Sequence, residues 1–274
     1  MPVDYHIHLE RGPFSLEYLR EFVDAAAERG IQEIGFSEHP YHFLECRRIY
    51  PSENPWVDAR CGRQLEEFVR LVEEAKDAGL PVKLGMEWDY IPGHEEEVAR
   101  LLDAYPWDYA IGSVHWLRNQ GRWWAVDDPN EQEEWRRQDP SQVYRQYFYH
   151  IESAATSGLF DVIGHLDLVK IFGYRPAEDL TALYEEVART LGRAGVCVEV
   201  SSAGWYKPVG EVYPGPELLG ILARFGVPVV PSSDAHEPGH VGRDFERVLA
   251  LIKAAGYTHV WTFSGRSRSP LPIL

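Results

Sequence analysis

Apolar and polar residues follow two alternating patterns along the chain, one with helical spacing and one typical of short buried strands. Between Ser15 and Gly30, apolar residues recur every three or four positions, which predicts an amphipathic helix capped by the Ser15 side chain. Residues 31–37 (IQEIGFS) then predict a strand. The alternation continues, with helices expected at about 63–78, 94–105, 141–157, 177–194, 216–225 and 244–255, and strands at 81–88, 108–116, 160–166, 196–202, 227–233 and 259–263.

The order of these elements indicates the fold class. Strands that alternate with helices of this length form parallel βαβ units. Seven or eight such units in 274 residues favour a closed α/β barrel over an open sheet. No linker, repeat or low-complexity tract divides residues 1–274, so we expect a single domain. One irregular stretch, residues 40–62, has the length of a functional loop.

The charge of the chain restricts its partners. The formal net charge is −16, from 43 acidic and 27 basic residues. This charge opposes non-specific attraction to nucleic acids and to anionic membranes, so we expect neither as a partner. An anionic substrate would need a local positive charge, and bound metal ions are the strongest source of one. The sequence does not indicate an oligomeric state.

The cysteines and the amino terminus bear on the compartment. Cys46, Cys61 and Cys197 are odd in number, lie far apart and form no C-x-x-C pair, which argues against a disulfide framework and a thiolate zinc site. The first residues lack the basic and apolar regions of a secretory signal. No apolar run is long enough to predict a membrane span. We therefore expect a cytoplasmic protein.

The most distinctive short stretch is VDYHIHLE at residues 3–10, which places His6, His8 and Glu10 at every second position. Alternate side chains of a strand point to the same face, so these three groups would project together. Two imidazoles at this spacing can converge on one cation, although a solvated strand face is the simpler interpretation of an isolated H-x-H.

Other potential metal ligands follow predicted strands elsewhere in the chain. They are His39, Glu87, His115, His165, Asp234 and His236. Parallel barrels build their active sites at the carboxyl ends of their strands, where all of these positions fall. A histidine in apolar context is usually a core residue when taken alone, but convergence at one end favours a cluster of metal ions.

The chain resembles the PHP (polymerase and histidinol phosphatase) superfamily, and within it the monofunctional histidinol-phosphate phosphatase branch. The six motifs that carry the resemblance are H-x-H at 6–8, SEHP at 37–40, GMEWDYIPGHE at 85–95, WDYAIGSVHWL at 107–117, GLFDVIGHLDLVKIFG at 158–173 and SSDAH at 232–236. The resemblance implies a distorted, TIM-like (β/α)7 barrel that holds two or three divalent metal ions (Mn, Fe or Zn).

The resemblance also implies three neighbouring metal sites, two of which share the carboxylate of Glu87. The implied ligands are His6, His8, Glu87 and Asp234 for the first site, Glu87, His115 and His165 for the second, and His39 and His236 for the third. The family often has another histidine six residues after the second histidine of H-x-H, where this chain has Phe14. Glu10 is the candidate substitute, and Glu38 replaces the more usual aspartate before His39.

The implied reaction is hydrolysis of L-histidinol phosphate by a hydroxide held between two metal ions. Lys170, and more weakly Lys207, are expected to bind the phosphate of this small phosphorylated metabolite, and Asp234 or His236 would pass a proton to the leaving alcohol. Three alternatives remain: another small phosphate ester, a metal-dependent amidohydrolase, and a PHP-like scaffold without catalysis.

Overall fold

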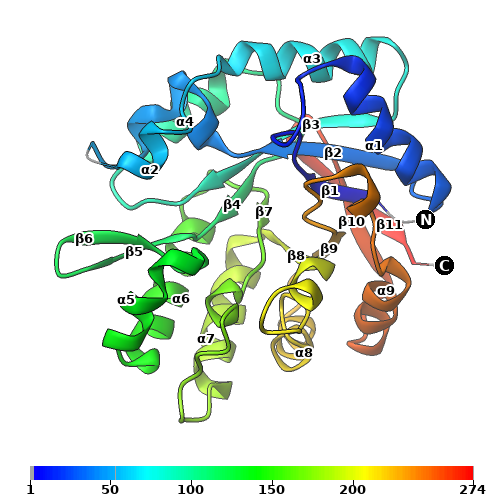
Figure 1. The fold of residues 1–274 in the computed structure, drawn as a ribbon. Coiled ribbons are helices and arrows are strands. Elements are labelled where there is room, and N and C mark those ends of the chain that lie inside the picture. The colour runs from blue at the N-terminus through cyan, green and yellow to red at the C-terminus, as the bar shows by residue number, and fades with distance from the viewer. Residues whose placement is uncertain (1–2, 53, 274) are drawn as a thin grey trace.

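The core of the protein is a ring of seven parallel strands, seen in a computed structural model that describes residues 3–52 and 54–273 (Figure 1). In sheet order the strands are β1 (Val3–Ile7), β2 (Glu33–Glu38), β3 (Val82–Asp89), β4 (Ile111–Ser113), β7 (Val162–Ile163), β8 (Cys197–Ser201) and β9 (Val229–Ser232). The ring closes where the backbone N–H of His8 donates to Ala235 and the N–H of Ala235 donates to His6, at 2.8 and 3.0 Å. The predicted distorted (β/α)7 barrel is confirmed.

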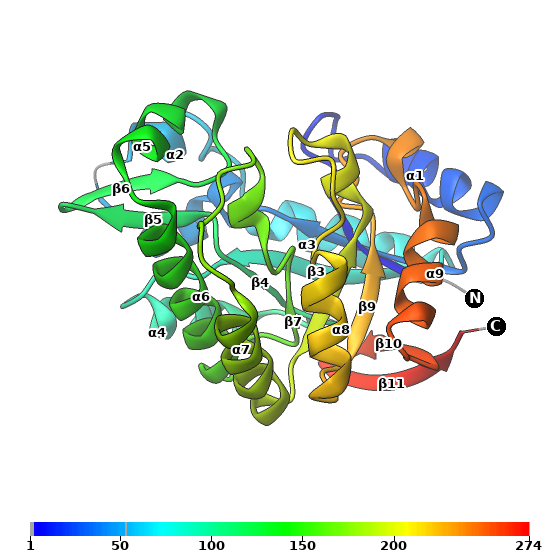
Figure 2. The same cartoon turned by 90° about the horizontal axis from the view of Figure 1, so that it is seen from below.

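Helices surround this ring and provide its outer layer (Figures 1 and 2). They are α1 (Leu16–Glu28), α3 (Leu65–Asp77), α4 (Glu95–Ala104), α6 (Pro140–Thr156), α7 (Thr181–Ala194), α8 (Pro216–Arg224) and α9 (Phe245–Ala254), with the shorter α2 (Pro55–Asp58) and α5 (Gln132–Arg137) in the loops. The cap predicted for the first helix is present, since the Ser15 side chain accepts a hydrogen bond from the N–H of Tyr18. No helix in the described residues has the length and apolarity needed to span a membrane.

Two predicted strands differ from the structure. The stretch expected at 259–263 forms β10 (His259–Ser264), which pairs antiparallel with β11 (Ser267–Pro272) beside the amino-terminal end of β9 (Figure 2). It does not become an eighth barrel strand, because the edge of β9 that it would join is already next to β1, which closes the ring. The strand expected at 108–116 shortens to β4, and its last residue begins a hairpin of β5 (Trp116–Asn119) and β6 (Arg122–Ala125).

Tyr109 fills the amino-terminal half of the barrel interior and explains two strand glycines. A Cβ atom on Gly85 would lie 2.2 Å from the Tyr109 ring, and one on Gly35 would lie 2.3 Å from its hydroxyl. The hydroxyl donates to the backbone oxygen of Tyr5 at 2.7 Å, and Phe263 of β10 packs against both rings. The absence of side chains at Gly35 and Gly85 therefore makes room for the Tyr109 ring, and the carboxyl half of the barrel is left for polar side chains.

Replacing Gly85 with alanine tests this packing. Because the new methyl group has no space beside the Tyr109 ring, G85A should lower the free energy of unfolding by about 1–3 kcal/mol. The measurement is chemical denaturation, with G220A as the matched control because a Cβ at Gly220 in α8 meets nothing within 4 Å. Equal stability of G85A and the unmodified protein would contradict the close packing.

Candidate metal centre

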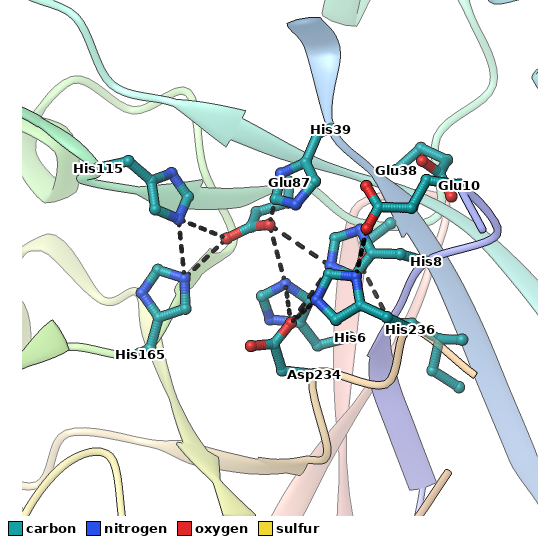
Figure 3. A network of polar contacts seen from close by, with 12 residues as sticks. His6, His8, Glu10, Glu38, His39, Glu87, His115, His165, Asp234 and His236 are labelled. Atoms are coloured by element: carbon teal, nitrogen blue, oxygen red, sulfur yellow. Dashed lines mark hydrogen bonds and ion pairs between the residues drawn. The ribbon is translucent and has the colours of Figure 1, made fainter. Parts of the chain in front are cut away.

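Strand β1 delivers two imidazoles into the carboxyl end of the barrel. His6 and His8 are fully buried, and their ring centroids lie 5.0 Å apart. Both face the carboxylate of Glu87, which lies near the end of β3 (Figure 3). The predicted convergence of the two histidines on one point is therefore observed.

Asp234 completes a first group of four ligand atoms. The Nε2 atom of His6 lies 3.1 Å from Glu87 Oε2 and 3.7 Å from Asp234 Oδ1. The Nε2 atom of His8 lies 3.6 and 3.4 Å from the same two oxygens. Ligands bound at about 2.1 Å in a tetrahedron lie about 3.4 Å from one another, so this group has the dimensions of a divalent cation site.

A second group uses the other oxygen of Glu87. Its Oε1 atom lies 2.8 Å from His165 Nε2 and 3.5 Å from His115 Nε2, and the two imidazole nitrogens are 3.2 Å apart. Figure 3 shows these histidines on one side of the carboxylate, with His6 and His8 on the other. One carboxylate thus faces two ligand groups, as a bridge between two cations requires.

A third group lies against the first. The rings of His39 and His236 both stack against the ring of His8, at centroid distances of 4.3 and 4.5 Å. One ligand atom from each of the three histidines lies within 4.8 Å of the others. His236 Nε2 is also 3.2 Å from Asp234 Oδ1, so the third group adjoins the first.

Several buried polar atoms of these groups form no hydrogen bond with any other described residue. They are His6 Nε2, both ring nitrogens of His8, His39 Nδ1, Glu87 Oε2 and His165 Nδ1. Buried polar atoms are normally paired, because leaving one without a partner costs about 1–3 kcal/mol. Burial and the charges of His39 and His236 lower the pKa of His8 to about 3, which leaves the neutral imidazole that a metal ion binds. These atoms fit divalent cations.

The position of Asp234 is fixed by the turn that follows β9. Its φ angle of 50° lies in the left-handed region, which aspartate tolerates better than most residues. The turn is held by the buried carboxylate of Asp4, which accepts hydrogen bonds from the N–H groups of Ser233 and Gly242 at 3.0 and 2.9 Å. Asp4 on β1 therefore sets the direction of a ligand that comes from the other end of the chain.

Glu10 lies outside the three ligand groups and contacts one of their members, His236. Its Oε1 atom is 2.7 Å from Nδ1 of His236, and its Oε2 atom is 3.1 Å from Nε2 of His42. Glu10, His42 and the buried Glu38 form a separate group, in which one ligand atom of each residue lies within 4.8 Å of the others. Phe14 packs instead against Phe43 and Phe68. Glu10 thus holds the ring nitrogen of His236 that faces away from Asp234.

Two carboxylates that orient the candidate ligands were not predicted. Glu199 of β8 places Oε2 at 2.5 Å from His6 Nδ1, and its Oε1 accepts from the N–H of His165 at 2.7 Å. Asp89 lies 2.6 Å from His115 Nδ1 and accepts from the hydroxyl of Tyr50. A carboxylate within the apolar strand VCVEVSS was the available signal for Glu199.

The two predicted phosphate-binding lysines have different surroundings. The ammonium of Lys170 is buried and lies 2.7 Å from both Asp167 Oδ2 and Glu211 Oε2, and it donates to the carbonyl of Val212 at 2.8 Å. These contacts take its three hydrogens, so its expected role in phosphate binding is not supported. Lys207 is partly buried and its ammonium contacts no acceptor among the described residues.

A cleft of about 320 Å³ opens beside His39 and His115. Aromatic rings and carboxylates contribute to its walls, from Tyr41, Trp56, Trp116, Asp127 and Asp128. The irregular stretch 40–62 supplies two of these rings, which agrees with a functional role for that loop. The cleft can receive a ligand whose anionic end reaches the histidines and whose cationic end meets aromatic and acidic groups.

Comparison with known proteins gives the family. The PHP domain model matches residues 4–203. The chain belongs to the PHP family. It is 36% identical to the "Probable histidinol-phosphatase" of Deinococcus radiodurans, covering 97% of this chain and 98% of that protein. It is 30% identical to the histidinol-phosphatase of Bacillus subtilis, covering 90% and 97% of the two chains. The family resemblance predicted from the motifs is confirmed.

Solved structures of PHP-type phosphatases share the fold. The histidinol phosphate phosphatase of Lactococcus lactis, solved with zinc, L-histidinol and phosphate, superposes with a TM-score of 0.74 at 23% identity and covers 98% of both chains. A putative histidinol phosphatase of Listeria monocytogenes gives a TM-score of 0.73 at 20% identity, over 89% of this chain and 99% of the other.

Replacing Glu199 tests how far this PHP chain depends on ligand orientation. E199Q keeps the size of the side chain but loses the charge that fixes His6, so divalent metal ions should bind about 10- to 100-fold more weakly. Chelator competition followed by metal analysis measures this change. E134Q is the matched control, because Glu134 is also a buried glutamate but contacts Asn119 and Arg122 instead. Equal affinities for E199Q and E134Q would contradict the orienting role.

Proposed function

We propose that this chain is a metal-dependent phosphomonoesterase that hydrolyses L-histidinol phosphate to L-histidinol and phosphate, as a step of histidine biosynthesis. The observation that carries the proposal is the geometry of Glu87, whose two oxygens face two separate groups of ligand atoms. The relatives from Deinococcus radiodurans and Bacillus subtilis match this chain along nearly their whole length, and both bear the name of a histidinol-phosphatase, which is qualified as probable for the first.

The chemistry of the ligands suits two or three divalent cations. Imidazole nitrogens and carboxylate oxygens without thiolates accept Zn, Mn and Fe. His6, His8, Glu87 and Asp234 would hold the first cation, Glu87, His115 and His165 the second, and His39 with His236 and His8 a third. Two such cations supply a nucleophile by lowering the pKa of water, and they neutralise the charge of a phosphoryl group.

The remaining residues would orient the substrate and move its protons. Asp234 and His236 lie at the edge of the cluster, 3.2 Å apart, where either can pass a proton to the leaving alcohol. Lys207 follows the short turn after β8, and its ammonium, which contacts no acceptor among the described residues, would bind the phosphate. Asp127 and Asp128, with the rings of Trp56 and Trp116, would hold the amine and imidazole of histidinol.

The net charge and the cysteines bear on the compartment and the partners of the protein. The net charge of −16 opposes binding to nucleic acids and anionic membranes. Cys46, Cys61 and Cys197 are all free, which agrees with a reducing compartment such as the cytoplasm. We therefore propose a cytoplasmic enzyme whose partner is a small phosphorylated metabolite.

A substrate panel tests the proposal. With Zn, Mn or Fe added separately, the protein should release phosphate from L-histidinol phosphate with a higher kcat/KM than from phosphate esters that lack a cationic group, because the cleft is acidic. Phosphate release and amide hydrolysis are measured in parallel. Hydrolysis of cyclic amides without phosphate release would indicate an amidohydrolase, and retention of metal without any turnover would indicate a scaffold. Either result would overturn the proposal.

A further inference from the structure

Tyr213 lies on the loop that follows β8, at the same end of the barrel as the metal centre. Its backbone pairs with Ser201 at the end of β8, through an N–H donated by each residue to the other's carbonyl, at 2.6 and 3.1 Å. Its ring stands edge-on to the ring of His165, with centroids 6.5 Å apart. The side chain is therefore a direct neighbour of a candidate ligand of the second cation.

The hydroxyl of Tyr213 is buried and has no hydrogen-bond partner in the described structure. Buried tyrosine hydroxyls usually have a partner, because an unpaired one costs free energy. A tyrosine hydroxyl carries its proton at neutral pH, where it can donate a hydrogen bond.

The ring contact with His165 shows where this side chain lies. It places an unpaired hydroxyl group on a side chain that is next to a candidate ligand of the second cation. Such a donor is suited to an anionic oxygen of a ligand bound at the metal centre.

Lys170 holds Tyr213 in this position. Its ammonium lies 5.3 Å from the centre of the Tyr213 ring, and it contacts Glu211 and Val212, which directly precede Tyr213. Asp167 anchors the same ammonium from the turn after His165, and it also accepts from the N–H of Gly215. The lysine expected to bind phosphate instead fastens the loop that carries the tyrosine.

We infer that the hydroxyl of Tyr213 donates a hydrogen bond to a phosphoryl oxygen of the bound substrate, with Lys170 as the positioning residue. This inference rests on the proposed phosphatase function. It assigns phosphate recognition to a neutral donor next to His165, where the motif alone suggested a cation. Inorganic phosphate presents the same oxygens, so it should use the same contact.

The test compares Y213F with the unmodified protein, both loaded with the same metal. Loss of a hydrogen bond to a charged oxygen should weaken inhibition by inorganic phosphate about 10- to 100-fold and lower kcat/KM for L-histidinol phosphate by a similar factor. Metal content per chain should not change, since no candidate ligand is altered. Direct titration with inorganic phosphate provides a readout that does not depend on turnover.

The matched control is Y144F. Tyr144 is also a buried tyrosine, but its hydroxyl donates to the backbone carbonyl of Tyr174 at 2.8 Å, so its loss should leave phosphate affinity unchanged. Phosphate affinity in Y213F equal to that in Y144F would overturn the inference. Loss of metal from Y213F would also overturn it, because the hydroxyl would then act through His165. An unmodified protein that binds phosphate without hydrolysing the ester would contradict only the proposed function.

Discussion

A single buried carboxylate, that of Glu87, imposes the main electrostatic constraint on this protein. The side chain is 1% exposed, and its two oxygens face different sets of imidazoles at 2.8 to 3.6 Å. Burial alone would raise the pKa of Glu87, but the charges of His6, His39 and His115 hold it well below its usual range. An ionised carboxylate that is buried this deeply needs positive charge beside both of its oxygens. Divalent cations would supply that charge without protonation of the surrounding imidazoles.

The barrel makes this arrangement possible because it brings strand ends together from most of the chain. His6 comes from β1 and Glu199 from β8, yet they lie 2.5 Å apart. Glu199 also holds the backbone of His165, so one carboxylate orients parts of two ligand groups. Lys170 lies shortly after His165 and contacts Glu211 in the loop after β8. This ion pair therefore joins that loop to the segment that carries a candidate ligand.

Local sequence patterns predicted the barrel and most of the candidate ligands, because strands, caps and polar strand ends are local features. Ring closure is not local. The segment that forms β10 was therefore expected to be a barrel strand, but it pairs with β11 and packs against Tyr5 of β1. The roles of Glu199 and Lys170 also depend on distant partners. Nothing near Lys170 in the sequence indicates that Glu211 contacts its ammonium.

Anomalous diffraction from crystals grown with the native metal tests the central claim most directly. Data collected at the absorption edge of that metal locate each cation without assumptions about the ligands. We expect two strong peaks on opposite sides of Glu87, each about 2.1 Å from one of its oxygens. A single peak, or cations bound with neither oxygen of Glu87 among their ligands, would contradict the bridging role of this carboxylate.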